Sequence, residues 1–248
     1  MRDDWLDLAF GASCLGCARP GRLLCAGCRS DLPRHGTAVR PDPAPPGLAP
    51  TYAAGWYADP LRGLLLAHKE RRALALTDPL GRVLAGVVRT ALGSAGVIGA
   101  GVVGAGVVLV PVPSARATTR ERGHDPVRRM VGVAARELRR GGIEVRTSAG
   151  LLRQRRVQAD QAGLAAADRA ANLSGSLGVV GREHRRLAGS GRPVLVVVCD
   201  DVLTTGSTAR EAQRALEVVG IPVAAIATVA ATQRRTPSAA RPAVRPAG

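Results

Sequence analysis

The sequence predicts an α/β fold, in which helices flank a parallel β-sheet and a small amino-terminal module carries four cysteines. Two aliphatic runs, 107–112 and 194–198, are typical of strands that a parallel sheet buries on both faces. Each run leads into a short polar loop and then an amphipathic helical pattern, which is the order of a strand–loop–helix unit. The chain has 248 residues, enough for one such domain and a small appendage.

The basic composition favours partners that carry many negative charges. The chain holds 35 lysine and arginine residues against 19 acids, for a net charge of +16, and Lys69 is its only lysine. Nucleic acids and pyrophosphate-bearing substrates are the partner classes that such a charge suits. Arginine, alanine and glycine are used throughout the chain, however, and aromatic residues make up only 2% of it. Base-stacking platforms for single-stranded nucleic acid are therefore scarce, and charge alone supports nucleic-acid binding weakly.

The chain shows no signal for export or membrane insertion. Its first ten residues carry acids where a secretion signal needs positive charge, and no apolar run reaches the length of a membrane span. We therefore expect a cytoplasmic protein without a membrane-spanning helix. The cytoplasm is a reducing compartment, which bears on how the cysteines are interpreted.

Four cysteines near the amino terminus predict a structural zinc site. Cys14 and Cys17 form one C-x-x-C pair, Cys25 and Cys28 form a second, and seven residues separate the pairs. Four thiolates in this arrangement match the tetrahedral coordination of structural zinc. Disulfides are disfavoured in a reducing compartment, and a redox C-x-x-C motif would need a strand–helix setting that is not visible here. The fifth cysteine, Cys199, falls within a predicted buried strand and is expected to be a core residue.

A proline-rich stretch divides the chain into two parts. Residues 41–50 lack hydrophobic periodicity and predict a linker between a zinc-binding module, 1–40, and the α/β domain, 51–235. Residues 236–248 are rich in proline, arginine and alanine and predict a disordered tail.

The first half of the α/β domain is expected to contain a short strand, two helices, a buried strand and a third helix. Their predicted positions are 51–57 for the short strand, 60–76 and 79–92 for the helices, 107–112 for the buried strand, and up to about residue 140 for the third helix. Lys69 and the charged residues 70–72 predict a solvated helix face. The glycine- and valine-rich stretch 93–106 fits a loop and a strand equally well.

The second half of the domain alternates short strands with basic segments. Strand pieces at 143–145 and 151–152 are expected to begin and end one strand, and 221–231 to form the last strand. Residues 153–172 are polar and basic at their start, which suits a lid over bound substrate or a plain surface helix. Residues 182–191 predict a basic turn.

The stretch 193–216 joins the second aliphatic strand to the residues that carry chemistry. Asp200 and Asp201 come where the strand is expected to end, and a turn at 203–208 leads into an amphipathic helix, 209–219. Open parallel sheets bind ligands at the carboxyl ends of their strands. Two carboxylates at this position suit sugar hydroxyls, directly or beside a divalent cation.

The turn that follows the two acids is suited to a phosphate group. A helix N-terminus offers unpaired N–H groups and the positive end of the helix dipole. Gly206 allows close approach of the backbone to a ligand, and hydroxyl groups add further donors from Thr204, Thr205, Ser207 and Thr208. The turn lacks the lysine of a P-loop, which disfavours nucleotide triphosphate hydrolysis.

A second polar loop follows the first aliphatic strand. Arg116, Arg120 and Arg122 crowd this strand end, where guanidinium groups suit a pyrophosphate. By charge alone, arginines that are merely solvated or paired with Glu121 fit the same pattern.

The order and spacing of these motifs resemble the ComF (competence protein F) family. The shared features are the cysteine pairs, the Val110-Pro111-Val112-Pro113 strand end with Arg122-Gly123, a pattern of Gln161, Leu164, Arg169 and Asn172, and the Asp-Asp-Val-Leu-Thr-Thr-Gly turn. The resemblance covers nearly all of residues 11–232. The chain departs from the family where Phe-Asn-Gln usually follows Arg-Gly, since it carries His124, Asp125 and Pro126 there.

The resemblance implies a type I phosphoribosyltransferase fold with an amino-terminal zinc finger. It implies phosphoribosyl pyrophosphate and Mg²⁺ as ligands and a role in DNA uptake during natural transformation. In this family Asp200 and Asp201 would hold the ribose 2′ and 3′ hydroxyls, and the turn would hold the 5-phosphate. Ser114 and Arg116 would belong to the pyrophosphate loop, and 153–172 falls in the flexible-loop region.

Three functions stay open at the level of sequence. The first is an enzyme or enzyme-like domain of the phosphoribosyltransferase class. The second is a nucleic-acid-binding accessory of the DNA-import machinery, which binds single-stranded DNA and uses the fold as a scaffold. The third is a nucleobase salvage transferase or a regulator of nucleotide genes, which the cysteine pairs disfavour because plain salvage enzymes have no need of them.

Overall fold

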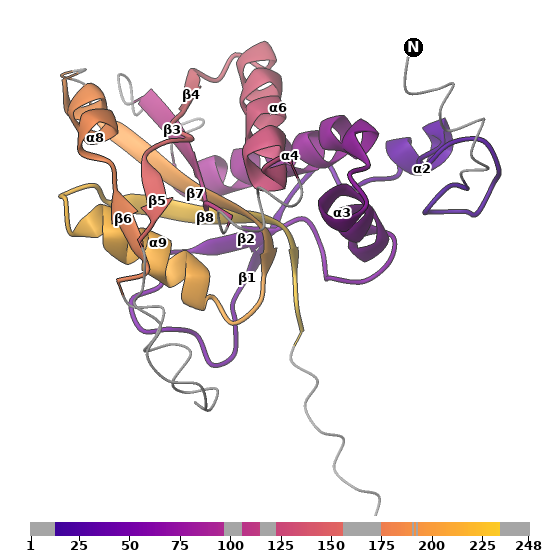
Figure 1. The fold of residues 1–248 in the computed structure, drawn as a ribbon, viewed down its shortest axis with the longest axis horizontal. Coiled ribbons are helices and arrows are strands. Elements are labelled where there is room, and N and C mark those ends of the chain that lie inside the picture. Colours follow the sequence, from indigo (N-terminus) through magenta and orange to yellow (C-terminus); the bar gives the residue numbers. More distant parts are fainter. Residues whose placement is uncertain are drawn as a thin grey trace, which may run out of the picture.

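A computed structural model describes residues 13–96, 106–114, 123–155, 175–189, 191 and 193–233. Its centre is a six-stranded sheet in which every neighbouring pair is parallel except β1 and β2 (Figure 1). In spatial order the strands are β1 (Thr37–Val39), β2 (Thr51–Ala53), β8 (Val223–Ala231), β7 (Val194–Leu203), β3 (Gly106–Pro111) and β4 (Val145–Thr147). The predicted α/β class with a mostly parallel sheet is therefore confirmed.

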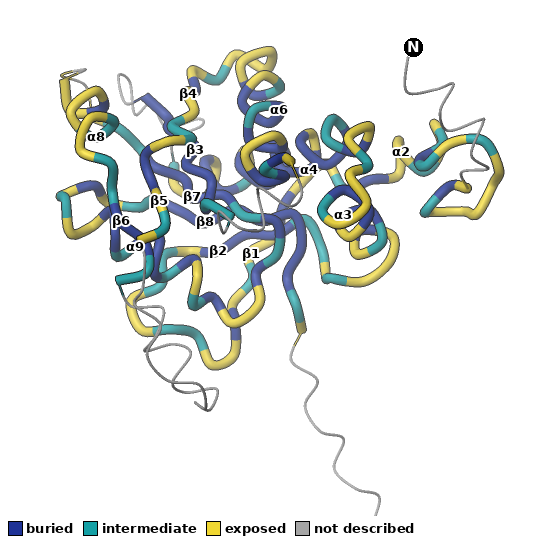
Figure 2. The backbone as a smooth tube through the Cα atoms, viewed as in Figure 1, coloured by how far each residue is buried: buried dark blue, intermediate teal, exposed yellow. Residues whose placement is uncertain are grey.

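Helices cover both faces of this sheet and create two hydrophobic cores. α4 (Thr77–Ser94) and α6 (Pro126–Arg140) pack on one face, and α9 (Ser207–Glu217) packs on the other. Alternate residues of each central strand enter different cores, so Val197 faces α4 and α6 whereas Val196 and Val198 face α9. Figure 2 shows the resulting buried layer along the central strands. The unbroken aliphatic runs in the sequence follow from this burial on both faces.

The predicted helices of the first half are present with small shifts at their ends. α3 spans Leu61–Glu70, a short 3-10 turn spans Leu74–Leu76, and α4 follows directly. α6 begins at Pro126 because the Asp125 side chain accepts a hydrogen bond from the backbone N–H of Arg128 at 3.0 Å. Asp125 and Pro126, where the sequence departs from the ComF pattern, thus act as a helix start.

Four segments differ from the expectation. β7 continues to Leu203, because Asp200, Val202 and Leu203 keep pairing with β8, so the two acids lie inside the strand end. α9 begins at Ser207, since left-handed Gly206 lets the chain enter the helix two residues earlier than predicted. Residues 143–152 do not form one strand: β4 joins the main sheet, whereas β5 (Leu152–Gln154) pairs with β6 (Leu177–Val179) in a separate sheet. The predicted basic turn is mostly a helix, α8 (Gly181–Ala188), which buries Leu187.

The small β5–β6 sheet is attached to α9 through a buried carboxylate. The Oε1 atom of Glu211 accepts a hydrogen bond from the backbone N–H of Leu177 at 3.0 Å, and Arg214 binds the same carboxylate at 2.6 Å. Burial raises the pKa of Glu211, but Arg214 and the N–H of Leu177 outweigh it and lower the pKa. Most of the segment interpreted as a lid or surface helix, 156–174, lies outside the described residues.

The cysteine module and the proline-rich stretch are both packed against the α/β domain. α2 (Ala26–Ser30) belongs to the module, and Thr37–Val39, assigned to the module by sequence, forms the edge strand β1. The stretch 41–50 contacts α9, where Gln213 accepts a hydrogen bond from the Ala49 N–H and donates one to the Gly47 carbonyl. Among the described residues, no helix combines the length and apolar character that a membrane span requires.

At Gly86 of α4, the chain that leaves the cysteine module lies against the α/β domain. A Cβ atom at this position would lie 2.1 Å from the backbone oxygen of Arg34. Gly36, two residues after Arg34, donates a hydrogen bond from its N–H to the Thr90 hydroxyl at 3.0 Å. The chain that leaves the module therefore lies directly against the α4 backbone, which any side chain at residue 86 would prevent.

Substitution of this glycine should loosen the contact between module and domain. We expect Gly86→Ala to lower the free energy of unfolding by about 1–3 kcal/mol, measured by urea denaturation, because the Arg34 backbone must move away. Gly132→Ala in α6 is the matched control, since a Cβ there meets nothing within 4 Å. The control should stabilise the protein by up to about 1 kcal/mol through helix propensity. Equal effects of the two substitutions would contradict the close approach at Gly86.

Candidate functional site

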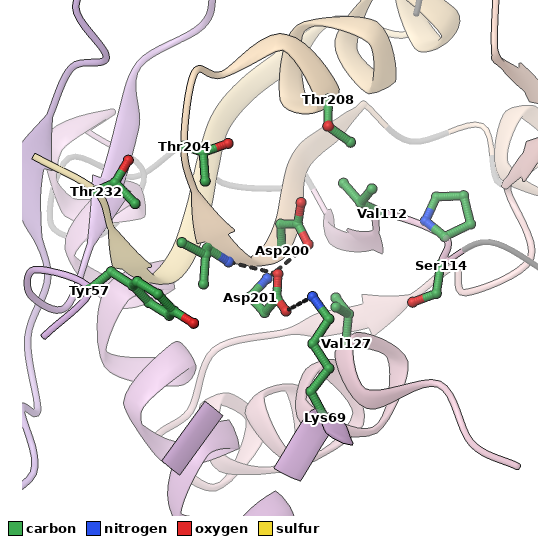
Figure 3. Close-up of a pocket in the computed structure, with 12 residues that line it drawn as sticks. Tyr57, Lys69, Val112, Ser114, Val127, Asp200, Asp201, Thr204, Thr208 and Thr232 are labelled. Atoms are coloured by element: carbon green, nitrogen blue, oxygen red, sulfur yellow. Dashed lines mark hydrogen bonds and ion pairs between the residues drawn. The ribbon is translucent and has the colours of Figure 1, made fainter. Parts of the chain in front are cut away.

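A cleft of about 520 Å³ opens at the carboxyl edge of the main sheet. Four neighbouring strands deliver their ends to it, and α3 and α6 close it from one side (Figure 3). The residues that line it are Tyr57, Lys69, Val112, Pro113, Ser114, Val127, Asp200, Asp201, Val202, Thr204, Thr208 and Thr232. The structure thus gathers the two acids, two hydroxyls of the predicted phosphate turn and Ser114 in one cavity.

The two acids are held in place by the backbone of β7. Asp200 Oδ1 accepts a hydrogen bond from the Asp201 N–H, and Asp201 Oδ1 accepts one from the Val202 N–H, both at 2.8 Å. Burial, followed by the negative charge of Asp201, raises the pKa of Asp200 well above its ordinary value. Two adjacent carboxylates in a partly desolvated cleft therefore need a cation or hydrogen-bond donors from a ligand.

Lys69 provides a cation in the cleft, although the sequence predicted that this residue lies on a solvated helix face. Its Nζ atom lies 2.7 Å from Oδ2 of Asp201, and the Asp201 side chain is only 12% exposed. α3 presents its apolar residues to the core and brings the end of the lysine side chain under β7 (Figure 3). The sequence carried one signal for this residue, namely that it is the only lysine in a chain rich in arginine.

The backbone of α3 next to Lys69 is anchored by two buried histidines. His68 Nε2 lies 2.9 Å from the Thr77 hydroxyl, and His124 Nε2 lies 3.2 Å from the His68 carbonyl oxygen. The rings approach edge to face, with their centroids 5.8 Å apart. Burial and the neighbouring His124 lower the pKa of His68 to about 4, so His68 is neutral at physiological pH. His124, the third departure from the ComF pattern, thus supports the helix that carries Lys69.

The turn after β7 has the geometry of an anion site. Gly206 adopts φ = +77°, a left-handed conformation, and directly precedes α9, whose first N–H, that of Ser207, donates a hydrogen bond to the Thr205 hydroxyl at 3.4 Å. The hydroxyls of Thr205 and Ser207 lie 3.0 Å apart, and Thr204 and Thr208 reach the cleft. The helix N-terminus therefore presents N–H groups and hydroxyl groups beside the two acids.

Gly206 is also packed tightly on its outer side. A Cβ atom there would lie 3.1 Å from both Leu48 and Pro41 and 3.3 Å from Pro45. The proline-rich stretch 41–50 therefore packs against the turn at 203–208, which was predicted to bind a phosphate. The interpretation of 41–50 as a linker did not predict this contact.

The predicted pyrophosphate loop is described only at its beginning. Ser114 lines the cleft, and the carbonyl of the preceding Pro113 accepts a hydrogen bond from Gln154 Nε2 at 3.4 Å. Arg116, together with Arg120 and Arg122, lies outside the described residues. Ser114 stands opposite Tyr57 and Thr232, two lining residues that the sequence did not single out (Figure 3).

The four amino-terminal cysteines form a separate cluster that can hold a metal ion such as zinc. Their sulfur atoms all lie within 4.8 Å of one another, and the described cysteines form no disulfide. The Cys25 N–H points to Cys14 Sγ at 3.4 Å, a type of hydrogen bond that favours thiolate ligands. A Cβ atom on Gly16 would lie 2.8 Å from Cys28 Sγ, so only glycine fits within the first knuckle.

A bound divalent cation would offset the negative charge that these sulfur atoms carry when they ionise. Burial raises the pKa of Cys14, but backbone N–H groups outweigh it and lower the pKa to about 6. Hydrogen bonds with the neighbouring thiols raise the pKa of Cys28 to about 12. Cys14 therefore ionises readily, whereas Cys28 does not unless a divalent metal stabilises its thiolate.

No protein-family model matches the chain, and no curated protein sequence matches it either.

The cysteine cluster should bind one zinc ion per chain in a closed, structural site. We expect the purified protein to contain close to one equivalent of zinc by elemental analysis, and Cys17→Ser to lose most of it because a ligand is missing. Cys199→Ser is the control, since Cys199 is fully buried in β7, away from the cluster. Zinc retained by Cys17→Ser at the native level would contradict a four-thiolate site.

Proposed function

We propose that this chain is a type I phosphoribosyltransferase-like protein of the ComF family that binds phosphoribosyl pyrophosphate with Mg²⁺. The observation that carries the proposal is the shared cleft, in which an acid pair and a hydroxyl-bearing helix N-terminus follow one another on the central strand. A phosphate and a polyhydroxylated sugar in a single ligand match these two neighbouring groups. The motif resemblance supports the same ligand.

The ligand would lie along the carboxyl edge of the sheet. Its 5-phosphate would bind the turn formed by Thr204, Thr205, Gly206, Ser207 and Thr208. Its ribose hydroxyls would donate hydrogen bonds to Asp200 and Asp201, and its pyrophosphate would extend toward the loop of Ser114 and Arg116. Mg²⁺ prefers oxygen ligands and would enter with the pyrophosphate, whose charge it would offset.

Catalysis in such a cleft would rest on positioning and charge. Displacement of pyrophosphate from the anomeric carbon passes through a cation-like sugar, which a nearby carboxylate stabilises. The turn and the acid pair grip the sugar at two points and so orient the anomeric carbon. We assign no residue as a protein nucleophile. By resemblance, the biological role would be DNA uptake in the cytoplasm of a naturally transformable cell.

Binding of phosphoribosyl pyrophosphate tests this proposal directly. Isothermal titration calorimetry in the presence of Mg²⁺ should show saturable binding that weakens when Mg²⁺ is removed. Asp200→Asn with Asp201→Asn should weaken binding at least about tenfold, because two charged acceptors for the ribose hydroxyls are lost. Asp78→Asn, on an exposed surface of α4, is the control and should bind as the native protein does. Absence of binding by the native protein would overturn the proposal.

Product analysis then separates an enzyme from a scaffold. The protein would be incubated with phosphoribosyl pyrophosphate, Mg²⁺ and a panel of nucleobases and nucleic acids. Release of pyrophosphate with one acceptor would establish a transferase. A free nucleobase as that acceptor would show that the protein acts in salvage.

A second candidate function, single-stranded DNA binding as part of DNA import, is favoured by a basic groove. This groove has a volume of about 550 Å³. One wall is α2 and the chain that follows it, and the other wall is α4. Five arginines line it: Arg22, Arg29, Arg34, Arg82 and Arg89. Its two acids, Asp78 and Glu137, both lie near Arg82, at 3.0 Å and 3.8 Å. Among the described residues, no ion pair engages Arg29, Arg34 or Arg89.

The groove suits the phosphate backbone rather than the bases. None of the described residues that line it is aromatic, so these residues offer no platform for base stacking. Guanidinium groups bind phosphate oxygens in pairs and would do so without regard to sequence. The tight contact at Gly86 keeps the two walls together.

Salt dependence tests this second candidate. Binding of a fluorescent oligo-dT should weaken with salt, and replacing Arg29, Arg34 and Arg89 with Gln should lower the log–log salt slope by about 2, from three lost phosphate contacts. The control replaces Arg182, Arg185 and Arg186 of α8, which removes the same charge elsewhere. Equal loss in both variants would show only a nonspecific effect of net charge and would count against the groove.

A further inference from the structure

The cleft poses an electrostatic problem that its described acids and hydroxyl groups do not solve. A ligand with a second phosphate group would bring several negative charges beside Asp200 and Asp201, which repel it strongly in a partly desolvated cavity. A fixed cation close to the acid pair would add to the charge compensation that Mg²⁺ supplies and would favour such binding. Among the described residues that line the cleft, Lys69 is the only one with a positive charge.

Lys69 lies on the side of the acid pair opposite the phosphate turn. Figure 3 shows Thr204 and Thr208 on one side of the two carboxylates, whereas Lys69 reaches Asp201 from the other. Ser114 lies on the same side of the pocket as the end of the lysine side chain. A ligand whose first phosphate occupies the turn and whose sugar meets the acids would therefore extend its second phosphate group toward Lys69.

The chemistry of lysine suits this position better than that of arginine. An ammonium group has three donors on a flexible stem, so it can hold Asp201 and a phosphate oxygen at the same time. The anchored α3 backbone at His68 fixes where the stem begins, while the side chain remains 36% exposed and accessible from the cleft. A guanidinium group would tend to bind the carboxylate with both arms of its fork.

We propose that Lys69 is a ligand-binding residue that receives the diphosphate group of the ligand, with Asp201 holding its ammonium group in place before the ligand binds. This inference rests on the proposed function for the location of the first phosphate and the sugar. It adds a binding residue contributed by α3, which lies more than 40 residues before Ser114, the first predicted residue of the cleft.

Comparison of three ligands tests the inference. Calorimetric titrations with Mg²⁺ would use phosphoribosyl pyrophosphate, ribose 5-phosphate, which lacks the diphosphate, and inorganic pyrophosphate. In Lys69→Met, affinity for phosphoribosyl pyrophosphate and for pyrophosphate should fall at least about tenfold, because a charge-assisted contact is lost. Affinity for ribose 5-phosphate should change by less than about threefold. Lys69→Arg should recover part of the lost affinity.

The control is Arg62→Met, which removes a charge from an exposed position on the same helix. It should leave all three affinities at native values, and circular dichroism should show native folding for every variant. Equal losses for phosphoribosyl pyrophosphate and ribose 5-phosphate in Lys69→Met would overturn the assignment, because Lys69 would then act only by orienting Asp201. Unchanged affinities would overturn it as well.

The same titrations separate this inference from the proposed function. A native protein that binds pyrophosphate through Lys69 but binds neither sugar ligand would contradict the proposed function and support the Lys69 subsite. A native protein that binds none of the three ligands would overturn both.

Discussion

The placement of two carboxylates at the end of the central strand is the constraint on which the rest of the site depends. The β7 backbone stabilises the carboxyl groups of Asp200 and Asp201 by donating hydrogen bonds to them, and Lys69 forms an ion pair with Asp201. This ion pair joins α3 to β7 and so links a helix on one face of the sheet to its carboxyl edge. The acids therefore serve both the tertiary structure and the cleft.

The parts of the chain outside the central sheet support this edge. The proline-rich stretch packs behind Gly206, Gln154 of β5 holds the Pro113 carbonyl, and the two histidines anchor the end of α3. Each support comes from a segment far from the acids in sequence. Such packing makes the cleft a preformed cavity, which would lower the entropic cost of binding a flexible ligand.

Positive charge is distributed so that two different anionic ligands can be accommodated. The cleft contains a single described cation beside two acids, a balance suited to a small ligand that carries both hydroxyls and phosphates. The groove beside the cysteine module has five arginines and two acids, which suits an extended polyanion. The net charge of the chain alone could not distinguish these two environments.

The order of residues was sufficient to predict the α/β class, the central strands, the cysteine cluster and the position of Asp200 and Asp201 beside the turn at Thr204–Thr208. These features depend on local order, because burial on both faces requires aliphatic runs and metal or phosphate sites require ligands at short spacing. The position of Lys69 beside Asp201, the packing of 41–50 and the separation of β4 from β5 became apparent only in the folded structure. These depend on contacts between distant segments, and neither periodicity nor composition encodes which distant side chain approaches a given strand end.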